Sequence, residues 1–248
     1  MATSLFVTEA SSGIGAAFLE QAPAEVNEPH TFSRRPSAGN WTQADPGHPR
    51  QRPAAYTEGM LRVTSSDPST RPSSIARAPT TPPGKVGDLD SYEYATVAPL
   101  NATVGPALSQ ALLRSSHQRG IRATLVLTSS PAADKNVHGM AHSCAAKHGM
   151  QRWGTIVALE QPPESGNRVV TVDTYTVLTD VTRSVITRTP DEVPLVTHLR
   201  QVEAAGDFAR PNTRTQQIWS VIYDAADGDI VAVGAVTIAQ RAAATAGV

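Results

Sequence analysis

Short runs of apolar residues alternate along the chain with longer stretches in which apolar positions recur at helical spacing. The clearest runs predict strands at residues 3–8, 123–128, 169–174 and 230–236. The helical spacing predicts helices at residues 92–113, 141–160, 191–205 and 213–224, with Pro99 and Pro106 interrupting the first of these. Strands that alternate with helices favour a parallel sheet with right-handed crossovers. The predicted fold class is therefore α/β: a single doubly wound domain over residues 1–248, with a parallel sheet flanked by helices.

Residues 36–84 carry the weakest pattern, because Pro, Ser, Thr and Arg dominate them. Composition alone favours a linker or a disordered segment there. Two short apolar stretches, Leu61–Val63 and Ser74–Ala76, are alternative candidates for a third and a fourth strand. A second strand is weakly indicated just before this segment, at residues 30–33.

The composition narrows the class of protein. Hydrophobic residues make up 40% of the 248, which is enough for a sizeable core, and the formal net charge is −1. A near-neutral chain is a poor partner for nucleic acid or an anionic membrane, so we expect neither. The single cysteine excludes an intramolecular disulfide, and no apolar run approaches the roughly 18 residues of a membrane span. We expect a cytoplasmic protein that acts on a small molecule, and we predict no metal site.

The turn after the first predicted strand is the first candidate site. A glycine turn between a strand and a helix aims the helix N-terminus at the pyrophosphate of a nucleotide. The carboxylate of Glu9 would repel a pyrophosphate unless it points away. The residues expected to contact the cofactor are Thr8, Ser11, Ser12, Gly13, Ile14 and Gly15.

A basic pair follows the second predicted strand, in Ser33-Arg34-Arg35. An acidic residue at this point grips the 2′-hydroxyl of NAD, whereas arginine accommodates the 2′-phosphate of NADP. No acid stands there, so the expected cofactor is NADP(H), bound by Ser33, Arg34 and Arg35. The alternative is a solvated basic loop without a ligand.

The segment from Ser143 to Lys147 resembles the Tyr-x-x-x-Lys motif of the short-chain dehydrogenase/reductase superfamily, with serine in place of the tyrosine. The i to i+4 spacing puts both side chains on one face of a helix. Five segments occur in the family's order over nearly the whole chain, so the resemblance implies an NADP-binding Rossmann domain. It also implies that Lys147 holds the nicotinamide ribose. A serine hydroxyl is far less acidic than a phenol, so Ser143 cannot serve as the same proton donor.

The resemblance implies roles for four further residues. Asp45 matches an aspartate that contacts adenine, and Thr179 matches the threonine that binds the nicotinamide carboxamide. Asn101 matches the helix asparagine of the family's proton relay, and its structural alternative is a residue at a helix kink. Ser130 has the family's spacing to the tyrosine position, which implies a hydrogen-bond donor to the substrate. Its structural alternative is a cap at the end of the strand.

The most distinctive departure follows Asp173, where the resemblance implies Pro-Gly and this chain has Thr174-Tyr175. An aspartate at the end of a buried strand is costly unless it is paired, and ligands bind at that edge of such sheets. An Asp and a Tyr at this point, without the usual tyrosine, resemble the fungal reductase/Diels-Alderases of malbrancheamide- and paraherquamide-type indole alkaloid biosynthesis.

That narrower resemblance implies NADPH-dependent reduction of a cationic, iminium-type intermediate, followed by a stereoselective intramolecular Diels-Alder cyclisation. Hydride delivery to an iminium carbon needs no proton donor, and a carboxylate that holds the cation becomes useful. The expected catalytic residues are Asp173, Ser130, Lys147 and Tyr175, under a substrate lid around residues 185–215. The resemblance also implies a homo-oligomer, a dimer or a tetramer.

Two other functions stay open. One is a catalytically degenerate relative that binds NADP(H) without turnover. The other is an ordinary carbonyl reductase that has recruited a different proton donor, such as Tyr175.

Overall fold

A seven-stranded parallel sheet forms the centre of the molecule in the computed structural model, which describes residues 3–44, 73–76, 83–224 and 230–232. The strand order is β3-β2-β1-β4-β5-β6-β7. The strands are β1 (Thr3–Thr8), β2 (Val26–Ser33), β3 (Asn40–Gln43), β4 (Ser73–Ala76), β5 (Thr124–Ser129), β6 (Arg168–Asp173) and β7 (Ile230–Ala232). The predicted α/β fold with a parallel sheet flanked by helices is confirmed.

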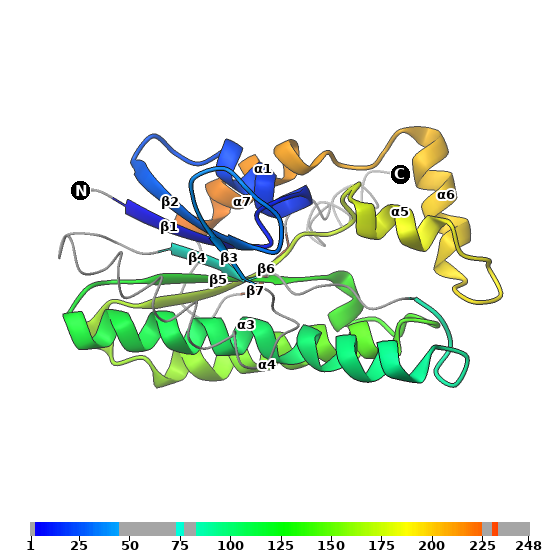
Figure 1. Ribbon diagram of the computed structural model, residues 1–248, viewed down its shortest axis with the longest axis horizontal. Coiled ribbons are helices and arrows are strands. Elements are labelled where there is room, and N and C mark those ends of the chain that lie inside the picture. Colours follow the sequence, from blue (N-terminus) through cyan, green and yellow to red (C-terminus); the bar gives the residue numbers. More distant parts are fainter. Residues whose placement is uncertain (1–2, 45–72, 77–82, 225–229, 233–248) are drawn as a thin grey trace, which may run out of the picture.

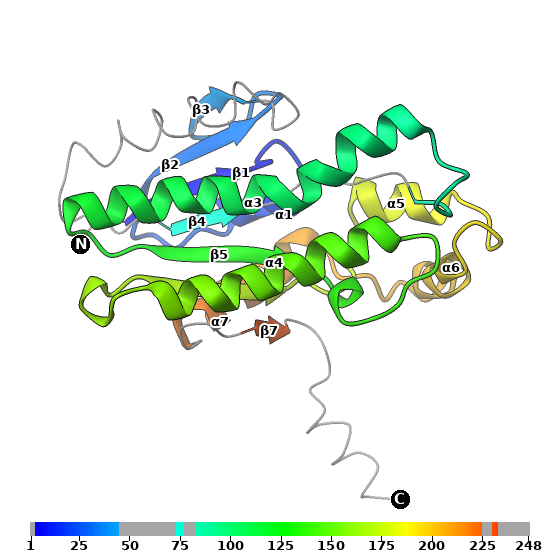
Figure 2. The ribbon, with the colours of Figure 1, turned by 90° about the horizontal axis from the view of Figure 1, so that it is seen from below.

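Helices cover both faces of the sheet and extend beyond one of its edges. They are α1 (Gly13–Glu20), α3 (Ser91–Arg119), α4 (Ala141–Glu160), α5 (Asp180–Ile186), α6 (Leu195–Ala205) and α7 (Pro211–Asp224), with short 3₁₀ turns η1 (Pro131–Ala133) and η2 (Pro163–Ser165). Figure 1 shows α1 and α7 on one face, α3 and α4 on the other, and α5 and α6 beyond the carboxyl ends of the strands. Figure 2 shows α3 and α4 side by side across their face.

Chain connectivity reverses direction at β1, because β2 and β3 extend to one side of it and β4 to β7 extend to the other. In an open parallel sheet, such a reversal leaves a crevice outside the carboxyl ends of the central strands. The carboxyl ends of β1 and β2 are in register at Thr8 and Phe32, and those of β5 and β6 at Ser129 and Asp173. The site described below lies at this edge.

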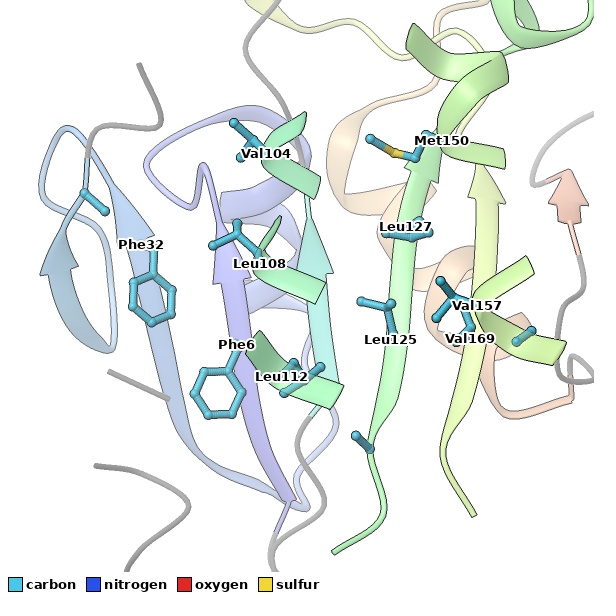
Figure 3. Close-up of a cluster of buried hydrophobic side chains, with 13 residues drawn as sticks. Phe6, Phe32, Val104, Leu108, Leu112, Leu125, Leu127, Met150, Val157 and Val169 are labelled. Atoms are coloured by element: carbon cyan, nitrogen blue, oxygen red, sulfur yellow. The ribbon is translucent and has the colours of Figure 1, made fainter. Parts of the chain in front are cut away.

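Successive side chains of the central strands point to opposite faces of the sheet and contribute to two hydrophobic cores, one on each face. Phe6 of β1 and Leu125 of β5 belong to the core under α3 and α4, together with Leu112 and Met150 (Figure 3). The neighbouring positions Leu5, Val7 and Val126 belong to the second core, under α1 and α7. In that core the rings of Phe18 and Trp219 stack with centroids 4.1 Å apart, and Trp219 Nε1 donates to the Phe18 carbonyl at 3.2 Å.

The prediction of a linker or disordered segment at 36–84 is wrong in part. Asn40–Gln43 forms the edge strand β3, which pairs with β2, and the thin strand expected at 74–76 is confirmed as β4. Composition missed β3 because an exposed edge strand needs no apolar run. The strand candidate Leu61–Val63 lies outside the described residues.

Other boundaries also differ from the sequence pattern. Helix α3 runs without a break from Ser91 to Arg119, so the interruption expected at Pro99 and Pro106 is wrong. Each proline removes one backbone donor, and packing of the other turns against the sheet and α4 stabilises the helix. The helix expected from residue 191 begins at Leu195, directly after Pro194. The last strand is confirmed for residues 230–232.

No helix in the described part of the chain is long and apolar enough to cross a membrane.

Candidate functional site

A cavity of about 210 Å³ opens at the carboxyl edge of the sheet, between the ends of β5 and β6 and the helices α4, α5 and α6. Hydroxyl side chains dominate the wall near the strands, and apolar side chains form the wall near α5 and α6. Among the described residues that line the cavity, Lys147 is the only charged side chain. The hydroxyl-bearing lining residues are Thr128, Ser129, Ser130, Ser143, Thr174, Tyr175, Thr176, Thr179 and Thr182.

The turn that joins β1 to α1 has the backbone shape of a dinucleotide-binding turn. Gly13 has φ +58°, which glycine adopts without strain, and a Cβ on Gly15 would lie 2.5 Å from the Glu9 carbonyl oxygen, so position 15 requires glycine. No side chain of Ser12 caps the helix, which leaves the N–H groups of its first turn to a ligand. These features fit a pyrophosphate, and Ile14 also lines the cavity.

Glu9 occupies this turn in a conformation that favours glycine. Its φ is +53°, and its backbone N–H donates to the Phe32 carbonyl at 2.8 Å, which ties the turn to the end of β2. A left-handed non-glycine residue costs roughly 1–2 kcal/mol. Glu9 therefore holds a strained backbone conformation in the turn that is expected to face the pyrophosphate.

The basic pair lies where β2 ends. Ser33 Oγ donates to the Arg35 carbonyl at 2.6 Å, which fixes the turn, and the side chains of Arg34 and Arg35 are exposed. This arrangement leaves both guanidinium groups accessible to a phosphate. Asp45, the expected adenine contact, lies outside the described residues.

Helix α4 presents Ser143 and Lys147 together to the cavity, as their spacing predicted. Lys147 Nζ donates to the carbonyl of Thr128 at 2.8 Å, which anchors the ammonium group to the end of β5. Asn101 of α3 is 4% exposed and lines the same cavity.

Two adjacent serines end β5 at the cavity wall. Ser130 Oγ accepts a hydrogen bond from the backbone N–H of Ala132 at 3.2 Å, so it caps η1 and also faces the cavity. Ser129 was not predicted as a site residue. Its buried Oγ has no hydrogen-bond partner among the described residues, and it lines the cavity too. The Ser-Ser pair in the sequence is the signal that could have drawn attention to it.

The turn after β6 contains the second non-glycine residue in the left-handed region. Tyr175 has φ +53°, a backbone conformation that glycine adopts freely, and it lines the cavity. Asp173 Oδ1 accepts a hydrogen bond from the Tyr175 backbone N–H at 2.8 Å. Asp173 itself is 7% exposed and is not among the cavity-lining residues.

Burial raises the pKa of the Asp173 carboxyl above its ordinary value. The hydrogen bond from Tyr175 and the positive charges of Lys135 and Arg214 partly offset this rise. Burial also lowers the pKa of the Arg214 guanidinium, and the charge of Asp173 opposes that shift. The strand end thus holds an interacting pair of opposite charges, contributed by β6 and α7.

Helices α5 and α6 form the cover over the cavity and have a small core of their own. Val185, Leu195 and Leu199 line the cavity, and Val185 and Leu199 also belong to the α5–α6 core. Thr179, expected to bind the carboxamide, accepts from Thr182 N at 3.5 Å at the start of α5 and lines the cavity. The predicted lid around 185–215 stays a prediction, and the cavity-lining residues Val181 and Thr182 show that α5, from residue 180, also borders the cavity. Residues from 211 belong to α7, which packs against α1.

Comparison with solved structures identifies this architecture. A short-chain dehydrogenase/reductase from Saccharomyces cerevisiae superposes with a TM-score of 0.78 at 12% identity, covering 93% of this chain and 96% of that one. The chain has the fold of the short-chain dehydrogenases/reductases. The ligand-free aldohexose dehydrogenase of Thermoplasma acidophilum gives 0.75 at 17% identity, over 94% of this chain and 92% of its own. A short-chain dehydrogenase from Streptomyces avermitilis gives 0.74 at 18%, over 99% and 93%.

No protein-family model matches the sequence, and no curated protein matches it either. The likeness to short-chain dehydrogenases/reductases is therefore one of fold, and the chemistry has to be argued from the site residues.

Three of the four residues that were expected to be catalytic lie around one cavity. Ser130, Lys147 and Tyr175 line one cavity with Asn101 and Thr179. Asp173 stands directly behind that wall. Its expected contact with the substrate stays a prediction.

Proposed function

We propose that this protein is an NADPH-dependent reductase of a small molecule that binds in the cavity under α5 and α6. The observation that carries the proposal is the composition of the α4 face, which presents an anchored lysine and, at the tyrosine position, only a serine hydroxyl. Bound NADPH would supply a hydride. The chain's own residues then have to bind the two molecules, orient them and exclude water.

The residues available to hold the cofactor run along the carboxyl edge of the sheet. The open N-terminus of α1 would accept the pyrophosphate, and Arg34 and Arg35 would pair with the 2′-phosphate. Lys147 would hold the ribose, and Thr179 would bind the carboxamide.

The expected acceptor is a cationic, iminium-type carbon. Reduction of such a carbon requires no proton, because the nitrogen already carries the charge, so a serine at position 143 suffices. The apolar wall from α5 and α6 would fold a flexible substrate into a compact shape, which is what an intramolecular cycloaddition requires.

A second function is favoured by a different observation, the presence of Tyr175 in the cavity lining. A carbonyl reductase needs a proton donor for the developing alkoxide, and the phenol of Tyr175 is a candidate for this role. The two functions differ in their demand on that phenol.

The experiment that separates them uses two acceptors of NADPH hydride, a dihydroisoquinolinium salt and acetophenone. Turnover is followed by the loss of NADPH absorbance, for the wild-type protein and for Tyr175→Phe. Iminium reduction predicts turnover of the salt that Tyr175→Phe retains. Carbonyl reduction predicts turnover of the ketone that Tyr175→Phe loses. Binding of NADPH without turnover of either acceptor would leave the non-catalytic function.

We also propose that the protein is a homo-oligomer. Two large apolar residues of α4, Ile156 and Leu159, are 41% and 84% exposed, which supports a protein-protein contact on that helix. Sedimentation of the wild-type protein beside Leu159→Glu tests this proposal, since the variant should dissociate.

A further inference from the structure

We infer that Asp173 is a positioning residue, which holds Tyr175 in the left-handed conformation that presents its side chain to the cavity. The inference deepens the proposed function and rests on it only for the statement that the substrate occupies the cavity. It assigns Asp173 a role different from direct contact with a cation.

The backbone of Tyr175 needs support from a neighbouring group. Its φ of +53° lies in the region that glycine adopts freely and that a side chain with a Cβ disfavours. Such a conformation persists only where the surroundings fix it. The carboxylate of Asp173, two residues earlier, accepts from the Tyr175 N–H at 2.8 Å and closes the turn.

Asp173 itself lies at the buried end of a strand. It pairs in register with Ser129 at the end of β5, and it is 7% exposed. The charge of Arg214, a buried residue of α7, acts favourably on it. Arg214 Nη1 in turn donates to Gln217 Oε1 at 3.0 Å, on the same helix. Asp173 therefore lies at a buried strand end, where the charge of Arg214 favours its carboxylate and the turn donates a hydrogen bond to it.

The cavity lining supports action through Tyr175. Thr174, Tyr175 and Thr176 all line the cavity, whereas Asp173 does not. The Oδ1 atom of Asp173 is engaged by a backbone donor of the turn. A substrate in the cavity would meet the turn first, with the carboxylate behind it.

The first test follows Tyr175 directly, without any substrate. The chain has five tyrosines, so fluorotyrosine incorporation gives a fluorine NMR spectrum with few resonances, and Tyr175→Phe assigns one by its disappearance. Asp173→Asn retains a side-chain oxygen acceptor and should leave the Tyr175 resonance in place. Asp173→Ala removes the acceptor and should shift or broaden it. Asp134→Asn is the matched control, because Asp134 is an exposed acid whose charge acts on Asp173.

The second test asks whether the effect passes through the conformation of Tyr175. Asp173→Ala should lower the melting temperature in the wild-type background and lower it much less in a Tyr175→Gly background, because glycine adopts a positive φ without support. Equal losses in the two backgrounds, or a Tyr175 resonance unmoved by Asp173→Ala, would overturn the inference.

Kinetics with the dihydroisoquinolinium salt and with acetophenone complete the test. For whichever acceptor the wild type reduces, kcat should fall about a hundredfold in Asp173→Ala, since misplacement of a site by about 1 Å costs this much. Asp173→Asn should retain most of the activity, with an unchanged KM for NADPH. Equal loss in both variants with an unmoved resonance would assign the charge to substrate contact and overturn the inference. If the wild type reduces neither acceptor, the proposed function fails, while the NMR and melting experiments still decide the role of Asp173.

Discussion

Replacing Glu9 by glycine should both stabilise the fold and strengthen NADPH binding. Glu9 has φ +53° in the turn that faces the expected pyrophosphate. Release of the left-handed strain contributes roughly 1–2 kcal/mol. The extra flexibility of glycine in the unfolded chain offsets about 0.5–1 kcal/mol. The net gain therefore lies between about 0 and 1.5 kcal/mol, and its middle value of about 0.75 kcal/mol corresponds to a rise in melting temperature of about 1.5–3 °C for a chain of this size.

The effect on binding has a separate cause. Removing one carboxylate near a pyrophosphate removes a repulsion of about 1 kcal/mol in a solvated site, or roughly a fivefold gain in NADPH affinity. Glu9→Ala is the control, because alanine removes the charge and keeps the left-handed strain. Calorimetry should show tighter NADPH binding for both variants, and thermal unfolding without ligand should show stabilisation for Glu9→Gly alone. A melting temperature of Glu9→Gly no higher than that of Glu9→Ala would refute the argument from strain.

Three further predictions concern the turn, the basic pair and the buried acid. Gly15→Ala should lower stability by about 1–3 kcal/mol in denaturant unfolding, because its Cβ would lie 2.5 Å from the Glu9 carbonyl oxygen. Replacing Arg34 and Arg35 together by alanine should weaken NADPH binding at least about tenfold and leave NADH binding unchanged in calorimetry, since NADPH alone carries the 2′-phosphate. Burial raises the pKa of the Asp173 carboxyl, so the folded protein binds the carboxyl proton more tightly than the unfolded chain does. This proton binding stabilises the folded state at low pH, and the stabilisation is lost as pH rises from the ordinary pKa of 3.8 through the raised pKa. Asp173→Asn should therefore gain stability relative to wild type as pH rises through that window, and a constant difference would contradict this.

The parts of the fold that the sequence predicted are those where burial dictates composition. Strands β5 and β6 are covered on both faces, so they appear as continuous apolar runs around Leu125 and Val170. The edge strand β3 is exposed, and its pairing with β2 leaves its side chains free to be polar. Helix α3 continues past Pro99 because tertiary packing outweighs local propensity, which a local pattern cannot reveal.

Part of the candidate site could likewise be predicted from the sequence, and part could not. Helical spacing predicted that Ser143 and Lys147 face one cavity, because that relation depends on local geometry alone. The left-handed conformation of Tyr175, whose backbone N–H donates to Asp173, was not predictable, since no local pattern in the sequence indicates it.

The most direct test of the proposed function is the transfer of hydride itself. NADPH deuterated at the transferable position is incubated with the protein and the dihydroisoquinolinium salt, and the product is analysed by mass spectrometry. The proposal predicts one deuterium at the former iminium carbon, both in the wild type and in Tyr175→Phe. A product without deuterium, or no product beyond that formed without the protein, would contradict it.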